Sequence, residues 1–263
     1  MSSARLRRDL ALVGWQVLYE QRAFWRNRAR AFFAFLFPII FLVIFSAIFQ
    51  SKTIYVGPHH FISYDTFFVP GILAYGVIAT TFLNMAVGTA VLRDDGVLKR
   101  MAGTPLPGWA YVAARIVSTL IVTIAMSALT LLIGYLVYNT KVRGATLPGL
   151  IVTLALGSAT FTTLGVGIVR YIKNAEAAPA VVNAAILPLT FISGIWFHFH
   201  LSSTLTDIAK VFPIRALADG LQHAYNPFTT GSGLEGSDLL TLAIWLVVGI
   251  AAMIRFLRRP ERV

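Results

Sequence analysis

Residues 31–49 read AFFAFLFPIIFLVIFSAIF, a run in which no side chain carries a charge. A helix of this length approaches the ~20 residues needed to cross a ~30 Å hydrocarbon core. Pro38 is compatible with such a span, because neighbouring helices can satisfy the carbonyl group that a proline leaves free. The run therefore predicts a transmembrane helix and, with it, a membrane protein.

The composition of the whole chain agrees with this prediction. Of its 263 residues, 57% are hydrophobic and 13% are charged, whereas a soluble domain carries about 25% charged residues. Uncharged runs predict six spans, at about 31–50, 69–92, 110–138, 147–169, 177–197 and 239–257. We expect an all-α membrane protein with one transmembrane domain over 1–263, divided into an interfacial helix in 1–30, a six-span bundle in 31–257 and a cytoplasmic tail in 258–263. The basic start of the chain does not resemble a cleavable signal.

Lysine and arginine divide unequally between the two sets of loops. Seventeen of the 22 fall on the side that holds both chain ends, and five fall on the other, while the 11 acidic residues divide six to five. Because cationic loops resist translocation, we assign the basic side to the cytoplasm and the protein to the cell's inner membrane. Contact with anionic lipid then accounts for the net charge of +11 without nucleic-acid binding.

The segment before the first span has the pattern of an amphipathic helix. Leu6, Leu10, Val13 and Val17 recur at helical spacing, and Glu20 is among the polar residues of the other side. We expect a helix that lies on the membrane surface. The alternative is a basic segment that only sets the topology.

The loop between the second and third spans contains its own helix signals. Asp94 suits an N-cap, Gly103 a C-terminal turn, and Pro105 stops continuation. The short helix presents Val97 and Leu98 outward and is expected to enter a groove on a partner protein, or alternatively to lie on lipid headgroups. The candidate coupling residues are Arg93, Asp94, Asp95, Gly96, Val97, Leu98, Lys99, Arg100 and Met101.

The segment from about 198 to 238, between the fifth and sixth spans, has internal order. After Pro213, an apolar helical stripe faces away from Arg215 and Asp219, which lie one turn apart. We expect an external re-entrant helical hairpin that caps the bundle, or alternatively a helix on the outer leaflet.

Several classes of chemistry lack the residues that they need. The sequence contains no phosphate-binding loop ending in Gly-Lys-Ser/Thr, no HExxH and no Gly-x-Ser-x-Gly. It contains no cysteine, and the histidine pairs His59–His60 and His198–His200 have no carboxylate at ligand spacing, so we expect no metal site and no catalytic residues. The middles of the spans hold no ionisable group to relay an ion, so energy for transport is expected from another chain.

With these features the chain resembles the permease subunits of type-2 ATP-binding-cassette exporters, in particular the daunorubicin and multidrug-resistance branch. The resemblance covers nearly the whole chain and is most specific in the loop 92–106, which reads LRDDGVLKRMAGTPL, followed by YVAAR at 111–115. A second part is FPIRALADGL at 212–221. The adjacent acids Asp94 and Asp95 depart from the single acidic residue found in many relatives.

The resemblance implies two six-span subunits, alike or different, around a central cavity. Two cytoplasmic ATPase subunits would bind ATP and magnesium and grip the first cytoplasmic loop of each permease. Substrate would pass between spans two and five, for which Asn84, Asn183, Thr190 and Phe191 are the candidate lining residues. Because those spans lack fixed charge, we expect outward export of an amphipathic small molecule, drug or lipid. The alternatives are a polysaccharide or glycolipid exporter, a non-transporting membrane scaffold or enzyme subunit, and a channel or secondary carrier that works without ATP.

Overall fold

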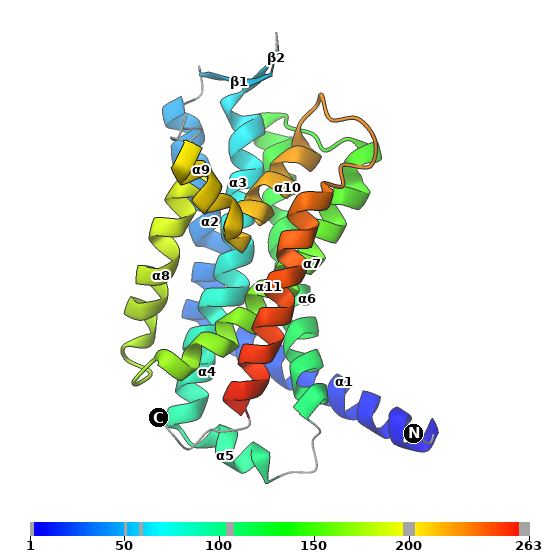
Figure 1. Ribbon diagram of the computed structural model, residues 1–263, viewed down its shortest axis with the longest axis vertical. Helices are drawn as coiled ribbons and strands as arrows, with labels where there is room; N and C mark the ends of the chain where they lie inside the picture. The colour runs from blue at the N-terminus through cyan, green and yellow to red at the C-terminus, as the bar shows by residue number, and fades with distance from the viewer. Residues whose placement is uncertain (1–2, 50–51, 58–59, 104–107, 197–202, 258–263) are drawn as a thin grey trace.

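The computed structural model describes residues 3–49, 52–57, 60–103, 108–196 and 203–257. This part of the chain forms a bundle of helices with one two-stranded antiparallel sheet at one end (Figure 1). The sheet consists of β1 (Thr53–Gly57) and β2 (His60–Ser63). We call this end the hairpin end. The opposite end carries the short helix α5 (Val97–Ala102) and is called the α5 end.

Five helical stretches of the described residues are long and apolar enough to cross a membrane. They are Ala31–Phe49, Tyr64–Asp94, Trp109–Tyr138, Gly144–Tyr171 and Gly236–Leu257, and they correspond to predicted spans one to four and six. Predicted span five, 177–197, contains α8 (Ala178–Ile192), an apolar helix of 15 residues that covers about 22 Å at 1.5 Å per residue. The chain is thus an α-helical, multi-pass membrane protein.

Three of the long stretches are single helices: α2 (Arg28–Phe49), α6 (Gly108–Tyr138) and α11 (Gly236–Leu257). The second span consists of α3 (Tyr64–Ile78), the π-helical turn η1 (Ala79–Leu83) and α4 (Asn84–Asp94). The fourth consists of η2 (Gly144–Thr146), α7 (Leu147–Ile168) and η3 (Val169–Tyr171). The remaining helices are α1 (Ser3–Arg26), α9 (Ser203–Val211) and α10 (Pro213–Tyr225). The predicted tail, 258–263, lies outside the described residues.

The second span begins at Tyr64, earlier than the predicted residue 69. The hydroxyl of Ser63 caps α3 by accepting a hydrogen bond from the backbone N–H of Thr66 at 3.4 Å. Asp65 lies in the first turn, where a negative charge favours the helix dipole. Polar capping residues thus extend the helix beyond the apolar run that hydropathy detects.

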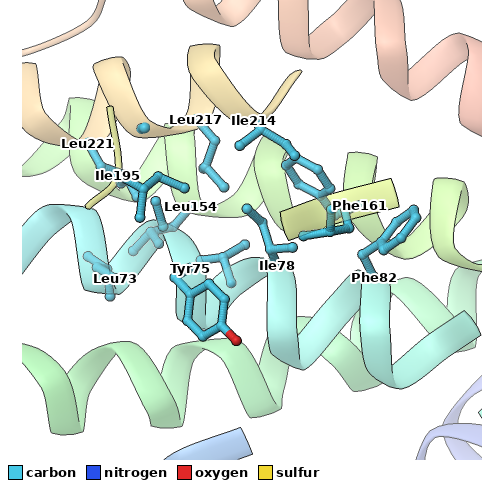
Figure 2. Close-up of a cluster of buried hydrophobic side chains, with 14 of the residues drawn as sticks. Leu73, Tyr75, Ile78, Phe82, Leu154, Phe161, Ile195, Ile214, Leu217 and Leu221 are labelled. Carbon is cyan, nitrogen blue, oxygen red and sulfur yellow. The ribbon is translucent and has the colours of Figure 1, made fainter. Parts of the chain in front are cut away.

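The α3 stretch is the centre of the bundle. Its most apolar window is 83% buried, whereas the corresponding windows of α2 and α11 are each 22% buried and therefore lie on the outside of the bundle. α10 lies among α3, α7 and α11, and Figure 2 shows its Ile214 and Leu217 beside Ile78 and Phe161. A helix between two spans of the sequence therefore fills the core of the hairpin half.

Helix α1 packs on α6, and the predicted apolar residues Val13 and Val17 are partly buried. Leu10, assigned to the apolar face, is 55% exposed, whereas Glu20, assigned to the polar face, is 9% exposed. The side chain of Gln21 also turns inward and donates to the carbonyl oxygen and hydroxyl of Ser118 on α6, at 2.7 and 2.9 Å. The buried face of α1 therefore also carries polar side chains that bond to α6, which the hydrophobic periodicity does not reveal.

Candidate functional site

The short helix between the second and third spans begins a few residues later in the chain than the sequence predicts. Asp94 was expected to start the short helix, but α4 continues through it and α5 starts at Val97. Gly96, with φ +68°, lies between the two helices in the left-handed region that glycine favours. The backbone therefore reverses at Gly96, and α5 leaves the bundle at an angle to α4 (Figure 1).

Arg93, at the end of α4, holds the connection between α7 and α8. Its guanidinium donates to the carbonyl oxygens of Val169 at 3.1 Å, Ile172 at 2.7 Å and Lys173 at 3.1 Å. Asp94 accepts a hydrogen bond from the backbone N–H of Ala175 at 2.6 Å and forms an ion pair with Arg93 at 3.0 Å. We call Arg93, Asp94 and the segment 169–175 the arginine clamp.

The clamp changes the roles expected of the candidate coupling residues. Arg93 and Asp94 bind within the chain, and Leu98 is 6% exposed because it packs into the hydrophobic core. Lys99 and Arg100 are exposed, as is Asp95, and Val97 is partly buried. The outer face of α5 available to a partner is therefore basic, while the side chain of Met101 is not described.

A buried ion pair fastens α1 to the base of α6. The guanidinium of Arg115 is 2% exposed and bonds the carboxylate of Glu20 at 3.2 Å. It also donates to the hydroxyl of Tyr111 from Nε at 2.9 Å and from Nη2 at 2.6 Å. The sequence pattern does not predict this cluster, because its acidic member lies 95 residues earlier in the chain.

Two of the predicted pathway residues lie at the hairpin end of α8. The hydroxyl of Thr190 is buried, donating to the carbonyl of Leu187 at 2.8 Å and accepting from the indole N–H of Trp196 at 3.2 Å. The ring of Phe191 is 49% exposed and lies 6.2 Å from that of Trp196. Thr190 therefore orients the indole ring of Trp196, and the exposed ring of Phe191 is available to contact another molecule.

Trp196 is the centre of an aromatic cluster between α2, α3 and the end of α8. Its ring centroid lies 5.3 Å from Phe41, 6.0 Å from Phe45 and 5.0 Å from Tyr75. On α2, every fourth residue from 33 to 49 is a phenylalanine, so that these rings form one continuous row. The four-residue repeat of phenylalanine in the sequence favours such a row, which the hydropathy of the run alone does not distinguish.

The two asparagines lie elsewhere. Asn84 is the first residue of α4, directly after η1, and Asn183 lies within α8; both are partly buried. Three of the four candidates, Asn183, Thr190 and Phe191, thus lie on α8, and Asn84 lies on α4, which contacts α8.

At the hairpin end, α9 and α10 form the helical pair expected between the last two spans. Pro213 is the first residue of α10, where its missing N–H costs nothing. Arg215 and Asp219 form an ion pair at 2.7 Å across one turn, as their spacing predicted. His59, His198 and His200 lie outside the described residues, and the residues that are described contain no group of three metal-ligating side chains.

The described residues thus form a bundle of apolar spans with a short helix, α5, that exposes Lys99 and Arg100 at one end. The family profile described as ABC-2 type transporter matches residues 13–225. The chain therefore belongs to the ABC-2 type transporter family and is a membrane subunit of such a transporter. No curated protein matches the sequence significantly.

Proposed function

We propose that the chain is the permease of an ATP-driven exporter that moves an amphipathic small molecule, drug or lipid out of the cytoplasm. ATP and magnesium are bound by a separate ABC ATPase, which docks on α5 at the cytoplasmic side of the inner membrane. The observation that carries this proposal is the arginine clamp beneath the exposed Lys99 and Arg100.

The clamp supplies a mechanical link from the ATPase to the transport path. A partner that pulls on α5 moves the end of α4, and Arg93 and Asp94 transmit the movement to segment 169–175. That segment leads directly into α8, which carries Thr190 and Phe191. Hydrogen bonds to a guanidinium are directional and strong enough to make such a link stiff.

The chemistry of the proposed path favours an apolar substrate. Phe191 and the cluster around Trp196 offer ring faces and a tyrosine, and the described parts of α2 after Arg30, α3 after Asp65, and α8 contain no charged side chain. An anionic polymer would need cations along its route. We assign the path to the surface between α3 and α8, facing a second permease copy or a related permease.

Charge reversal on α5 tests the partnership. We expect Lys99→Glu with Arg100→Glu to abolish copurification of a co-expressed Walker-type ABC ATPase, because an acidic face replaces a basic one. The purified permease alone is expected to hydrolyse no ATP. Lys210→Glu, an exposed change on α9, is the matched control. Retained ATPase binding and export in the double variant would refute the coupling role of α5.

The substrate class is tested by retention of hydrophobic drugs and dyes in cells with and without the permease and its ATPase. Faster efflux of at least one amphipathic compound supports the proposal. Unchanged retention across a broad panel, together with loss of a surface glycan in the deletion strain, would assign the protein to polysaccharide export.

A further inference from the structure

An apolar cavity of about 270 Å³ lies on the membrane side of α7, between α8 and α11. Helix α8 contacts α4, η1, α9 and α10, and its residues Ala185, Ile186 and Leu189 line the cavity. Phe212 and Pro213, at the junction of α9 and α10, also line it. The cavity is thus framed by α7, α8, α11 and the α9–α10 junction, with Phe82 contributed by η1.

The inner wall is formed by two rings in the core. Phe82 from η1 and Phe161 from α7 are 6% and 1% exposed and lie edge to face, with centroids 6.5 Å apart. Figure 2 shows both rings beside Ile214. The π-helical turn matters here, because Phe82 is one of the five residues of η1. A local distortion of the second span therefore contributes to the wall of the cavity.

The lining leaves a polar ligand without a suitable partner. The indole N–H of Trp245 already donates to the carbonyl oxygen of Val211 at 2.7 Å. Tyr171, the other polar lining residue, is 77% exposed. A polar head group would lose its hydration here without replacement hydrogen bonds, which is unfavourable. The apolar lining therefore favours a hydrocarbon ligand over a polar one.

The volume of the cavity and the lipid around it limit which hydrocarbon ligand can bind. Drug-sized ligands occupy pockets of about 300–1,000 Å³, so this cavity is suited to part of a molecule. Leu187 on α8 and Val247 on α11 are exposed side chains of the two flanking helices and face the bilayer. Phospholipid tails are therefore the molecules that surround the cavity at the highest concentration.

We propose that this cavity is a binding site for one acyl chain of a bilayer phospholipid, which enters sideways between α8 and α11. The chain fills the interval between α8 and α7 and holds α8 at its distance from the bundle. The inference is independent of the exported substrate, since it requires only the membrane and the packing of these helices.

The test uses the full chain in nanodiscs that contain a phospholipid with a diazirine near the end of one acyl chain. After irradiation, mass spectrometry maps the labelled residues. We expect labelling of Ile186 and Ala252, inside the cavity, to exceed that of the lipid-facing Val247. Ala185→Trp fills the cavity and should lower labelling of Ala252 roughly ten-fold, because a close-packed interior has no room for both groups.

Ala184→Trp adds the same side chain to an exposed neighbour on α8 and should leave the labelling unchanged. If Ala185→Trp does not fold, Leu189→Trp and its exposed control Leu187→Trp form a second pair. Equal labelling of Ala252 and Val247, or labelling that Ala185→Trp does not change, would reduce the site to ordinary surrounding lipid. A disulfide that forms between two Ala252→Cys chains on oxidation, in place of lipid labelling, would assign the cavity to a second copy and overturn the proposal.

Discussion

Arg115 lies in the wall between α1 and α6 with almost no contact with solvent. A buried charge is tolerated only when its counter-charge and hydrogen bonds are in place, and here Glu20 and Tyr111 supply them. Such a pair fixes the orientation of α1 more than it adds net stability. The sequence could not reveal it, since hydropathy detects an arginine near a span end but not a carboxylate 95 residues earlier.

We expect Glu20→Gln to destabilise the fold by about 3–5 kcal/mol, because it leaves the Arg115 guanidinium buried without its counter-charge. Thermal unfolding of the detergent-purified chain measures the loss. The double variant Glu20→Leu with Arg115→Met should recover most of it. Asp207→Asn, in an exposed pair with Lys210, should change stability by less than about 1 kcal/mol. A Glu20→Gln protein as stable as the parent would contradict the buried pair.

The second residue prediction concerns the arginine clamp. Arg93→Lys keeps the charge but loses the planar fork that reaches three carbonyl oxygens. We expect ATPase binding to persist while export falls roughly ten-fold, a barrier change of about 1.4 kcal/mol. Copurification and efflux, measured on the same cells, separate the two effects. Arg170→Lys, on the same connection, is the control, and export at parental rate in Arg93→Lys would remove the clamp from the mechanism.

At the scale of elements, the apolar runs predicted the long spans well because a membrane helix must be both long and apolar. What they missed is the structure at the ends and the interruptions. Ser63 extends α3, and Gly96 separates α4 from α5. In the π-helical turn η1, the hydroxyl groups of Thr80 and Thr81 donate hydrogen bonds to backbone carbonyl oxygens one turn earlier, at 2.8 and 2.6 Å. These are local hydrogen bonds, which a hydropathy average does not contain.

The contact between α3 and the chain leaving α8 gives the element prediction. Gly71 lies against the carbonyl oxygen of Ile195, and a Cβ atom there would overlap it. Gly71→Ala should therefore displace the end of α8 and cost roughly 1–3 kcal/mol. Thermal unfolding and quenching of Trp196 fluorescence report the two effects. Gly144→Ala, where the space is open, should be nearly neutral; equal behaviour of the two variants would argue against close packing at Gly71.

At the scale of the whole molecule, charge predicts how the bundle sits in the membrane. The described ends of the chain and α5 lie at one end of the bundle, and β1, β2 and α9 lie at the other (Figure 1). Basic residues gather at the α5 end, for which a cytoplasmic position is expected. The undecided element is α8, since its 15 residues are fewer than the ~20 of a typical span.

Single-cysteine labelling decides whether α8 crosses, and the absence of native cysteine makes it free of background. We introduce Lys99→Cys on α5, Glu176→Cys before α8 and Asp207→Cys on α9, all exposed positions. If α8 crosses, a membrane-impermeant maleimide should label Asp207→Cys in intact cells, and the other two only after permeabilisation. The reason is geometric: Asp207 follows α8, whereas Glu176 precedes it.

α8 lies alongside the bundle from the α5 end toward the hairpin end (Figure 1), so a local thinning of the bilayer or snorkelling of flanking groups would accommodate its length. Ser232→Cys, in the exposed loop before α11, is the external control. Asp207→Cys that stays unlabelled until permeabilisation, while Ser232→Cys reacts from outside, would remove the fifth crossing and with it the six-span topology.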